Sequence, residues 1–170
     1  MPQLPDPTAA PDLDARLAAL EARVRVLEDE NALHRLMTSY GPAVDSGSAE
    51  EAGALWTADG TYETDGGPGV MEGSAGVAAM VRGRGHQSLL PNCAHQVGPG
   101  VVRVDGDRAE ATTYSRVYLR EGDAYRVWRV AANHWQFART DAGWKVVRRL
   151  NRSLGHPESQ AILRHALDLS

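Results

Sequence analysis

The sequence predicts a single α+β domain in which helices come first and an antiparallel sheet comes last. A chain of 170 residues is long enough for one well-buried core, and its length calls for no second domain. Apolar residues recur at helical spacing before residue 45, whereas four strand-like runs follow residue 93. The turns between those runs are too short for a crossover helix, so the strands are expected to be antiparallel neighbours.

The N-terminal part divides into two expected segments. Residues 1–12 are rich in proline and aspartate and are expected to be a disordered lead. Residues 13–28 are expected to form a helix, because their apolar residues are spaced alternately by four and three: Leu13, Leu17, Leu20, Val24 and Leu27. With only about two heptads present, this helix either lies on its own domain or pairs with another copy. A break is expected near residues 29–31.

The next segment, residues 29–155, is expected to be the main domain. It begins with a second helix that ends at Gly41 and Pro42, followed by a short helical segment over residues 49–56. A turn at residues 58–60 precedes a strand over residues 61–64. The glycine-rich residues 65–75 indicate a hairpin or a mobile loop, a candidate lid, and residues 75–82 are compatible with a helix.

Four long strands are then expected, each separated from the next by a short polar turn that is typical of a hairpin. Their expected bounds are 93–104, 108–120, 124–139 and 144–154. Residues 156–170 complete the chain as a C-terminal helix and tail, with the helix over 158–167.

Composition excludes several classes of function. The net charge of -4 offers no basic surface for phosphates, so no nucleic-acid partner is expected. One cysteine allows no internal disulfide, and the N-terminus has no signal-peptide pattern, so a cytoplasmic location is expected. Apolar runs are far shorter than the roughly 20 residues of a membrane span. Scattered histidines and the absence of a nucleotide-binding fingerprint predict no metal and no cofactor.

The third strand places polar residues on a covered face. Alternation puts Arg129, Asn133 and Trp135 on one face and His134 on the other. Neither face is cleanly polar, so both are expected to be covered, one by a pocket and one by a neighbour or a subunit. Burying Arg129 beside Asn133 is costly without a partner. Arg129 therefore either pairs with a nearby acid or contacts a ligand.

Asp45 and His95 are the remaining candidates, although sequence alone does not bring them together. Asp45 precedes Ser-Gly-Ser, where an aspartate is commonly a cap or turn residue. His95 has small and apolar neighbours, as a buried structural histidine would.

Several segments, in this order and spacing, resemble the SnoaL-like branch of the nuclear transport factor 2-like superfamily. They are the runs 33–45, 55–60, 93–95, 104–109 and 139–146, and the resemblance extends over roughly residues 27–153. It implies a cone-like curved sheet wrapped around N-terminal helices and a pocket. Within that branch the chain is similar to scytalone dehydratase, bile acid 7α-dehydratase and gamma-hexachlorocyclohexane dehydrochlorinase, which are cofactor-independent lyases.

By motif position, the resemblance assigns His95 as the base, Asp45 as the carboxylate that orients it, and Tyr40 as the acid. Asn133 falls where the dehydratases have an active-site asparagine. The remaining candidates for substrate contact are Arg129, Trp135, Tyr62, Thr64 and His86, although a solvated loop histidine is the favoured interpretation of His86. The chain departs from scytalone dehydratase in having no histidine within residues 116–119, and in Thr64 standing where that enzyme has a tyrosine.

The resemblance implies a dehydratase-type lyase that acts on a hydrophobic cyclic, polyketide-like or steroid-like small molecule. Two alternatives stay open: an isomerase or polyketide-type cyclase that uses the same His/Asp pair, and a binding module without catalysis. The heptad helix and the two-faced third strand further predict a homodimer or a homotrimer.

Overall fold

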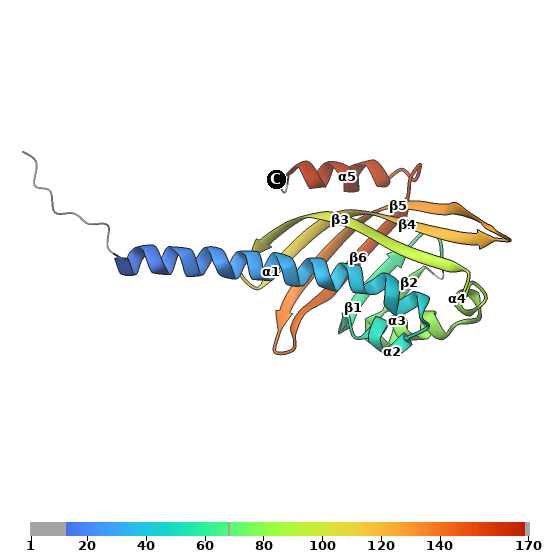
Figure 1. Ribbon diagram of the computed structural model, residues 1–170, viewed down its shortest axis with the longest axis horizontal. Coiled ribbons are helices and arrows are strands. Elements are labelled where there is room, and N and C mark those ends of the chain that lie inside the picture. Colours follow the sequence, from blue (N-terminus) through green and yellow to red (C-terminus); the bar gives the residue numbers. More distant parts are fainter. Residues whose placement is uncertain (1–12, 68, 169–170) are drawn as a thin grey trace, which may run out of the picture.

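A computed structural model describes residues 13–67 and 69–168, in which a curved six-stranded sheet has helices on both faces. The long helix α1 (Leu13–Asp45) runs beneath the sheet together with α2 (Ala49–Gly53), α3 (Gly73–Arg82) and α4 (Arg84–Gln87), and α5 (Ser159–Asp168) lies on the opposite face (Figure 1). The α+β fold with a curved sheet is confirmed. The expected N-terminal lead, residues 1–12, lies outside the described residues.

The sheet has the strand order β2-β1-β6-β5-β4-β3. The four long strands begin and end within one residue of their expected bounds: β3 (Cys93–Asp105), β4 (Arg108–Glu121), β5 (Ala124–Thr140) and β6 (Gly143–Ser153). Among the described strands every neighbouring pair is antiparallel except β1 and β6, which are parallel. The expectation of a wholly antiparallel sheet is wrong at this pair, because helices and four strands, rather than a hairpin, connect β1 to β6.

The first helix contains no break, so the expected boundaries near residues 29–31 and at Gly41 are wrong. Helix α1 continues through Pro42 to Asp45. Its buried side continues as well, through Leu33, Met37 and Val44, and this packing compensates for the hydrogen bond that a proline cannot donate. Asp29 does mark a change in packing, because the residues before it are exposed while those after it meet the sheet.

The connections before β3 differ from expectation in detail. Strand β1 (Trp56–Thr64) starts five residues early, with a register shift between Trp56 and Thr61 in place of the expected turn. The glycine-rich segment is a hairpin between β1 and β2 (Val70–Glu72), and α3 begins at Gly73. Of the two interpretations of this segment, the hairpin is the one observed.

The core lies between the concave side of the sheet and α1. Trp135 and Phe137 from β5 stack on each other with ring centroids 6.1 Å apart, and Trp56 from β1 lies 6.3 Å from Trp135. Over the described residues, no helix is long and apolar enough to cross a membrane.

Candidate active site

A cavity of about 970 Å³ opens between the concave face of the sheet and helices α1, α3 and α4. Its wall combines apolar side chains such as Met80, Leu89 and Val117 with a few polar groups, among them Tyr40 and His95. This volume and this mixture are typical of small-molecule sites.

Asp45 and His95 meet at the edge of this cavity. The Asp45 Oδ1 atom lies 2.6 Å from His95 Nδ1, and Oδ2 accepts a hydrogen bond from the His95 backbone N–H at 2.6 Å. Asp45 is the last residue of α1 and His95 is the third residue of β3. The helix reaches the strand because Gly41 has no side chain: a Cβ there would lie 2.1 Å from the His95 carbonyl oxygen.

This arrangement fixes the tautomer of His95. A carboxylate accepts hydrogen bonds, so Nδ1 carries the hydrogen and Nε2 keeps its lone pair. His95 lines the cavity, and its Nε2 has no hydrogen bond to any described residue. With 17% of its side chain accessible, the ring is largely desolvated but within reach of a ligand. The pair has the arrangement of a general base with its orienting carboxylate.

Cys93 lies beside this pair. Its Sγ lies 3.5 Å from Asp45 Oδ1, and ligand atoms of Asp45, Cys93 and His95 all lie within 4.8 Å of one another. Burial and the Asp45 carboxylate raise the pKa of the Cys93 thiol to about 11. The free thiol therefore stays protonated at neutral pH and does not compete with His95 as a base. A second group, Glu110, His134 and His165, joins α5 to the outer face of the sheet.

Arg149 on β6 is the strongest feature of the site that sequence reasoning missed. Its side chain is 1% exposed, and its guanidinium lies 4.1 Å from the ring centre of Trp135, 4.4 Å from that of Tyr40 and 4.6 Å from that of Tyr62. Nε and Nη2 donate to Asn133 Oδ1 at 3.0 and 2.8 Å. Nη1 is buried without a hydrogen-bond partner among the described residues.

A buried guanidinium with no carboxylate beside it carries an uncompensated charge. Arg149 lines the cavity, and no described acidic residue forms an ion pair with it. The site is therefore electrostatically matched to a ligand that carries or develops negative charge.

Tyr40 contacts Arg149 and lies close to the Asp45–His95 pair, hereafter the dyad. Its ring centroid lies 6.3 Å from that of His95, and its side chain lines the cavity. Burial raises the pKa of the Tyr40 hydroxyl well above its ordinary value, Tyr62 adds to the rise, and Arg149 opposes it. The hydroxyl therefore stays protonated at neutral pH and can donate a hydrogen bond.

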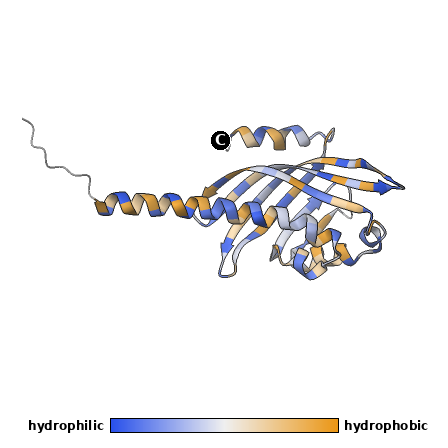
Figure 2. Cartoon of the chain, in the orientation of Figure 1, coloured by the Kyte–Doolittle hydropathy of each residue, from blue (hydrophilic) through white to orange (hydrophobic). Residues whose placement is uncertain are grey.

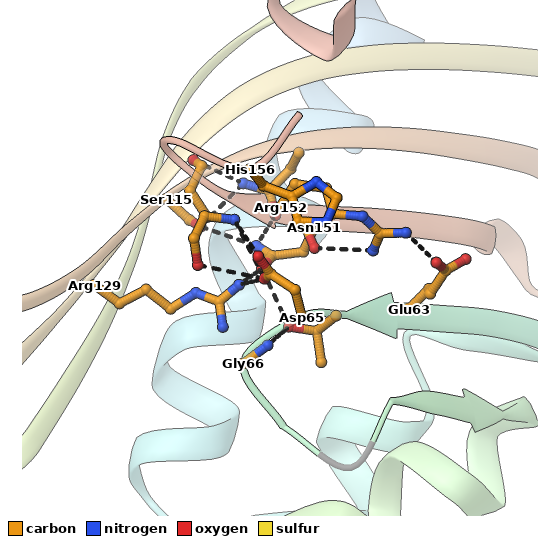
Figure 3. Close-up of polar contacts among 12 residues, drawn as sticks. Glu63, Asp65, Gly66, Ser115, Arg129, Asn151, Arg152 and His156 are labelled. Carbon is orange, nitrogen blue, oxygen red and sulfur yellow. Dashed lines mark hydrogen bonds and ion pairs between the residues drawn. The ribbon is translucent and has the colours of Figure 1, made fainter. Parts of the chain in front are cut away.

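Arg129 lines the cavity but is neutralised by an acid, the structural alternative weighed for it. Its guanidinium bonds to Asp65 and, at 2.6 Å, to Asn151 Oδ1 (Figure 3). Burial alone would raise the pKa of Asp65, but the Ser153 amide and Arg129 outweigh it and hold that pKa below its usual value. The ligand contact that was the other alternative for Arg129 suits Arg149 better, because Arg149 forms no ion pair with a described residue.

Of the other predicted site residues, some line the cavity and others hold the residues that line it. Tyr62, Thr64 and His86 line the cavity. The favoured interpretation of His86 as a solvated loop residue is wrong, because α4 buries it and its Nε2 lies 2.8 Å from the Val44 carbonyl oxygen. Asn133 is fully buried and does not belong to the described cavity wall; it holds Arg149 instead.

Trp135 is a core residue rather than part of the wall. Its side chain is fully buried, it does not belong to the described cavity wall, and its Nε1 donates to Thr113 Oγ1 at 3.0 Å. Alternation along β5 correctly placed Trp135 on the inner face of the sheet. Whether an inner residue reaches the cavity depends on what covers it, and Trp56 packs near Trp135. His134 lies on the opposite face, as expected, beside α5.

Arg149 was missed because β6 is irregular. Partners shift between Gln136 and Phe137, which pair with Arg148 and Val146, so the alternation of β6 reverses at this point. The signal that remained was the polar residues Arg149 and Asn151 at a spacing of two near the end of a strand.

Known proteins resemble this chain both in sequence and in fold. The SnoaL-like domain family matches residues 25–150. A nuclear transport factor 2-like protein with a cystatin-like fold from Novosphingobium aromaticivorans is 40% identical, with 91% of this chain and 99% of that one covered and a TM-score of 0.83. No match was found among curated proteins.

Two more distant structures share the fold. A protein of unknown function from Mycobacterium tuberculosis is 20% identical, with 86% of this chain and 94% of that one covered and a TM-score of 0.66. A protein named as a candidate aromatic ring hydroxylase, also from Novosphingobium aromaticivorans, is 24% identical, with 75% and 90% covered and a TM-score of 0.61.

Proposed function

Because this chain belongs to the SnoaL-like domain family of the nuclear transport factor 2-like superfamily, a fold of small-molecule-binding or enzymatic domains, we propose that it is a cofactor-independent lyase of the dehydratase type. Its substrate is a hydrophobic cyclic small molecule, polyketide-like or steroid-like, that loses water next to a carbonyl group. The observation that carries this proposal is the 2.6 Å contact between Asp45 and Nδ1 of His95, which leaves Nε2 available at the cavity.

The proposed reaction begins with proton removal. Nε2 of His95 takes the proton from the carbon next to the carbonyl, and Asp45 stabilises the imidazolium that forms. The electron pair of the broken C–H bond moves onto the carbonyl oxygen, which becomes an enolate. The positive charge of Arg149, a residue of the cavity wall, stabilises this oxygen, and the Tyr40 hydroxyl supplies a hydrogen bond to it; such groups act most strongly in a desolvated site.

Elimination completes the reaction. The enolate electrons form the carbon–carbon double bond as the C–O bond to the β-hydroxyl breaks, and the imidazolium returns its proton to the departing oxygen. One water molecule leaves and His95 regains its starting state. Burial raises the pKa of Tyr40, so in this proposal Tyr40 donates a hydrogen bond and keeps its proton throughout. Its role is therefore that of a hydrogen-bond donor, in place of the proton-donating acid that the resemblance implied.

The test is turnover of β-hydroxy carbonyl compounds built on fused or aromatic rings, followed by mass spectrometry for loss of one water. His95→Ala should lower kcat/KM by about two to four decades. Asp45→Asn should also lower it strongly, because an amide in that position no longer stabilises the imidazolium. His34→Ala, a half-buried histidine of α1 that does not belong to the described cavity wall, is the matched control. An unchanged rate in His95→Ala would refute the proposal.

The same dyad supports a second reaction class. If the enolate is reprotonated at another carbon, or attacks a second carbonyl, the protein is an isomerase or a polyketide-type cyclase, as the shared proton shuttle permits. A product with unchanged mass would favour isomerisation over dehydration.

A binding module without catalysis is the third possibility, and the unpaired Arg149 is the observation that favours it. Such a module would keep its ligand affinity in His95→Ala and lose it in Arg149→Met, which retains much of the side-chain volume but removes the charge. Isothermal titration with an aromatic carboxylate as the probe separates these outcomes.

A further inference from the structure

The first half of α1 stands away from the domain. It extends beyond the edge of the sheet (Figure 1), and apolar residues recur along it (Figure 2). Its apolar side chains are exposed to an unusual degree: Leu13 75%, Leu17 54%, Leu20 54%, Val24 49% and Leu27 63%. Side chains of this size are rarely left exposed in a continuous stripe on a monomer.

This helix is rigidly joined to the domain where it first meets the sheet. Asp29 receives two hydrogen bonds from Arg139, at 2.8 and 2.7 Å, and one from Trp144 Nε1 at 2.9 Å. Residues from Leu33 onward are then buried against the sheet. Because the docked half already forms a helix, the exposed half extends it without a separate nucleation step, which isolated short helices must overcome.

The stripe has the order of a coiled-coil seam. Leu13, Leu20 and Leu27 occupy the d positions of successive heptads, and Leu17, Val24 and Asn31 occupy the a positions. Leucine at every d position, with the β-branched Val24 at one of the three a positions, favours two parallel strands, and a single asparagine at a specifies register and two-stranded pairing. The side chain of Asn31 is exposed and available for such a contact.

The flanking charges distinguish the two possible orientations. Arg16 and Arg23 occupy g positions, and Glu21 and Glu28 occupy the e positions five residues further on. In a parallel pair each g residue faces the e residue of the following heptad in the other helix, so Arg16 meets Glu21 and Arg23 meets Glu28. In an antiparallel pair, arginine would face arginine and glutamate would face glutamate.

We propose that residues 13–31 of two copies of this chain form a parallel two-stranded coiled coil that makes the protein a homodimer. The occupant of the exposed stripe is a second copy because the stripe and its flanking charges are complementary to themselves. Both folded domains then project from the same end of the coiled coil. This inference does not depend on the proposed lyase activity.

The first experiment measures the mass of the full chain by light scattering. The wild type should have twice the monomer mass of 18.4 kDa. Leu20→Glu places charge in the seam and should halve the observed mass, whereas Val26→Glu, at an exposed position outside the seam, should leave the dimer intact. Circular dichroism checks that both variants stay folded, as expected for exposed positions.

Three outcomes would overturn the proposal. A wild-type monomer would do so, whether or not it binds lipid vesicles or another protein. A trimer would refute the two-stranded assignment. Equal masses for Leu20→Glu and Val26→Glu would show that any dimer forms through another surface.

Orientation is tested by disulfide formation in a Cys93→Ser background. Leu17→Cys and Leu27→Cys should each cross-link to their own copy under mild oxidation, because equal positions face each other in a parallel pair. Antiparallel alignment of residues 13–31 would instead place Leu17 opposite Leu27, so only a mixture of the two variants would cross-link, and that result would overturn the proposed orientation. Val26→Cys is the control for random collision.

Discussion

Gly41 determines how closely α1 approaches β3, and Gly41→Ala should therefore destabilise the protein. The added Cβ would lie 2.1 Å from the His95 carbonyl oxygen and 3.2 Å from its carbonyl carbon, whereas ordinary contacts are 3.4–4 Å. Both obstructing atoms belong to the backbone and cannot rotate away. The helix and the strand must separate by about 1 Å or more, a typical overpacking strain.

The magnitude follows from opposing contributions. Alanine stabilises a helix interior by about 1 kcal/mol relative to glycine. Overpacking costs about 1–3 kcal/mol, and stretching the two 2.6 Å hydrogen bonds of Asp45 leaves partly buried polar groups unsatisfied at a cost of about 1–3 kcal/mol. The net expectation is a loss of about 3 kcal/mol, from the midpoints of these ranges. A displacement of about 1 Å at the dyad should also lower turnover by about 100-fold.

Urea unfolding measures this change as a lower midpoint with an unchanged slope. Gly85→Ala is the matched control, because a Cβ at this helical position meets nothing within 4 Å, and it should match or slightly exceed wild-type stability. If Gly41→Ala were as stable as Gly85→Ala, the close approach of α1 to β3 would not hold the dyad together.

Three further predictions concern contacts outside the dyad. Asp29→Ala should lower the free energy of unfolding by about 1 kcal/mol, since Arg139 holds the pKa of Asp29 below its usual value; Asp107→Ala, which removes an exposed partner of the same Arg139, should change it by far less. The pKa of Asp65 is lower in the folded protein than its unfolded value of 3.8, so the Asp65 carboxylate stabilises the fold above pH 3.8, and this stabilisation is lost as the pH falls through the folded pKa. Asp65→Asn should therefore lower the free energy of unfolding at neutral pH and make it depend less on pH in acid. Urea unfolding at a series of pH values measures both effects. His165→Ala removes the contact of α5 with Glu110 and should accelerate amide hydrogen exchange in α5 alone. Exchange rates in α5 equal to those of the wild type would contradict this prediction.

Local patterns in the sequence predicted most of the secondary structure. The four long strands were placed within a residue because polar turns separate runs that are long enough to exclude other assignments. The break expected at residues 29–31 shows the opposite case. Asp29 has a low helix propensity and therefore suggested a break, yet the helix continues through it. Arg139 and Trp144, more than a hundred residues later, bind its carboxylate, and no local pattern reveals these partners.

The site was predictable where a resemblance supplied the pairing and obscure where the sheet departs from regular alternation. No local pattern brings Asp45 to His95, which lie fifty residues apart. Arg149 escaped notice because the irregularity in β6 turns it inward, a feature that depends on the register with β5. Arg129 drew attention for a correct reason, the cost of burial, but Asp65 offsets that cost.

The parallel pairing of β1 with β6 has a consequence for synthesis in the cell. β1 is synthesised before β3, β4, β5 and β6, yet β6 is its partner on one side in the sheet, and Tyr62 pairs with Arg149. Such distant pairing slows folding. A nascent chain that stops before β6 would expose the β1 edge and lack Arg149 and Asn151 in the cavity wall, so the cavity can be complete only after β6 has been made.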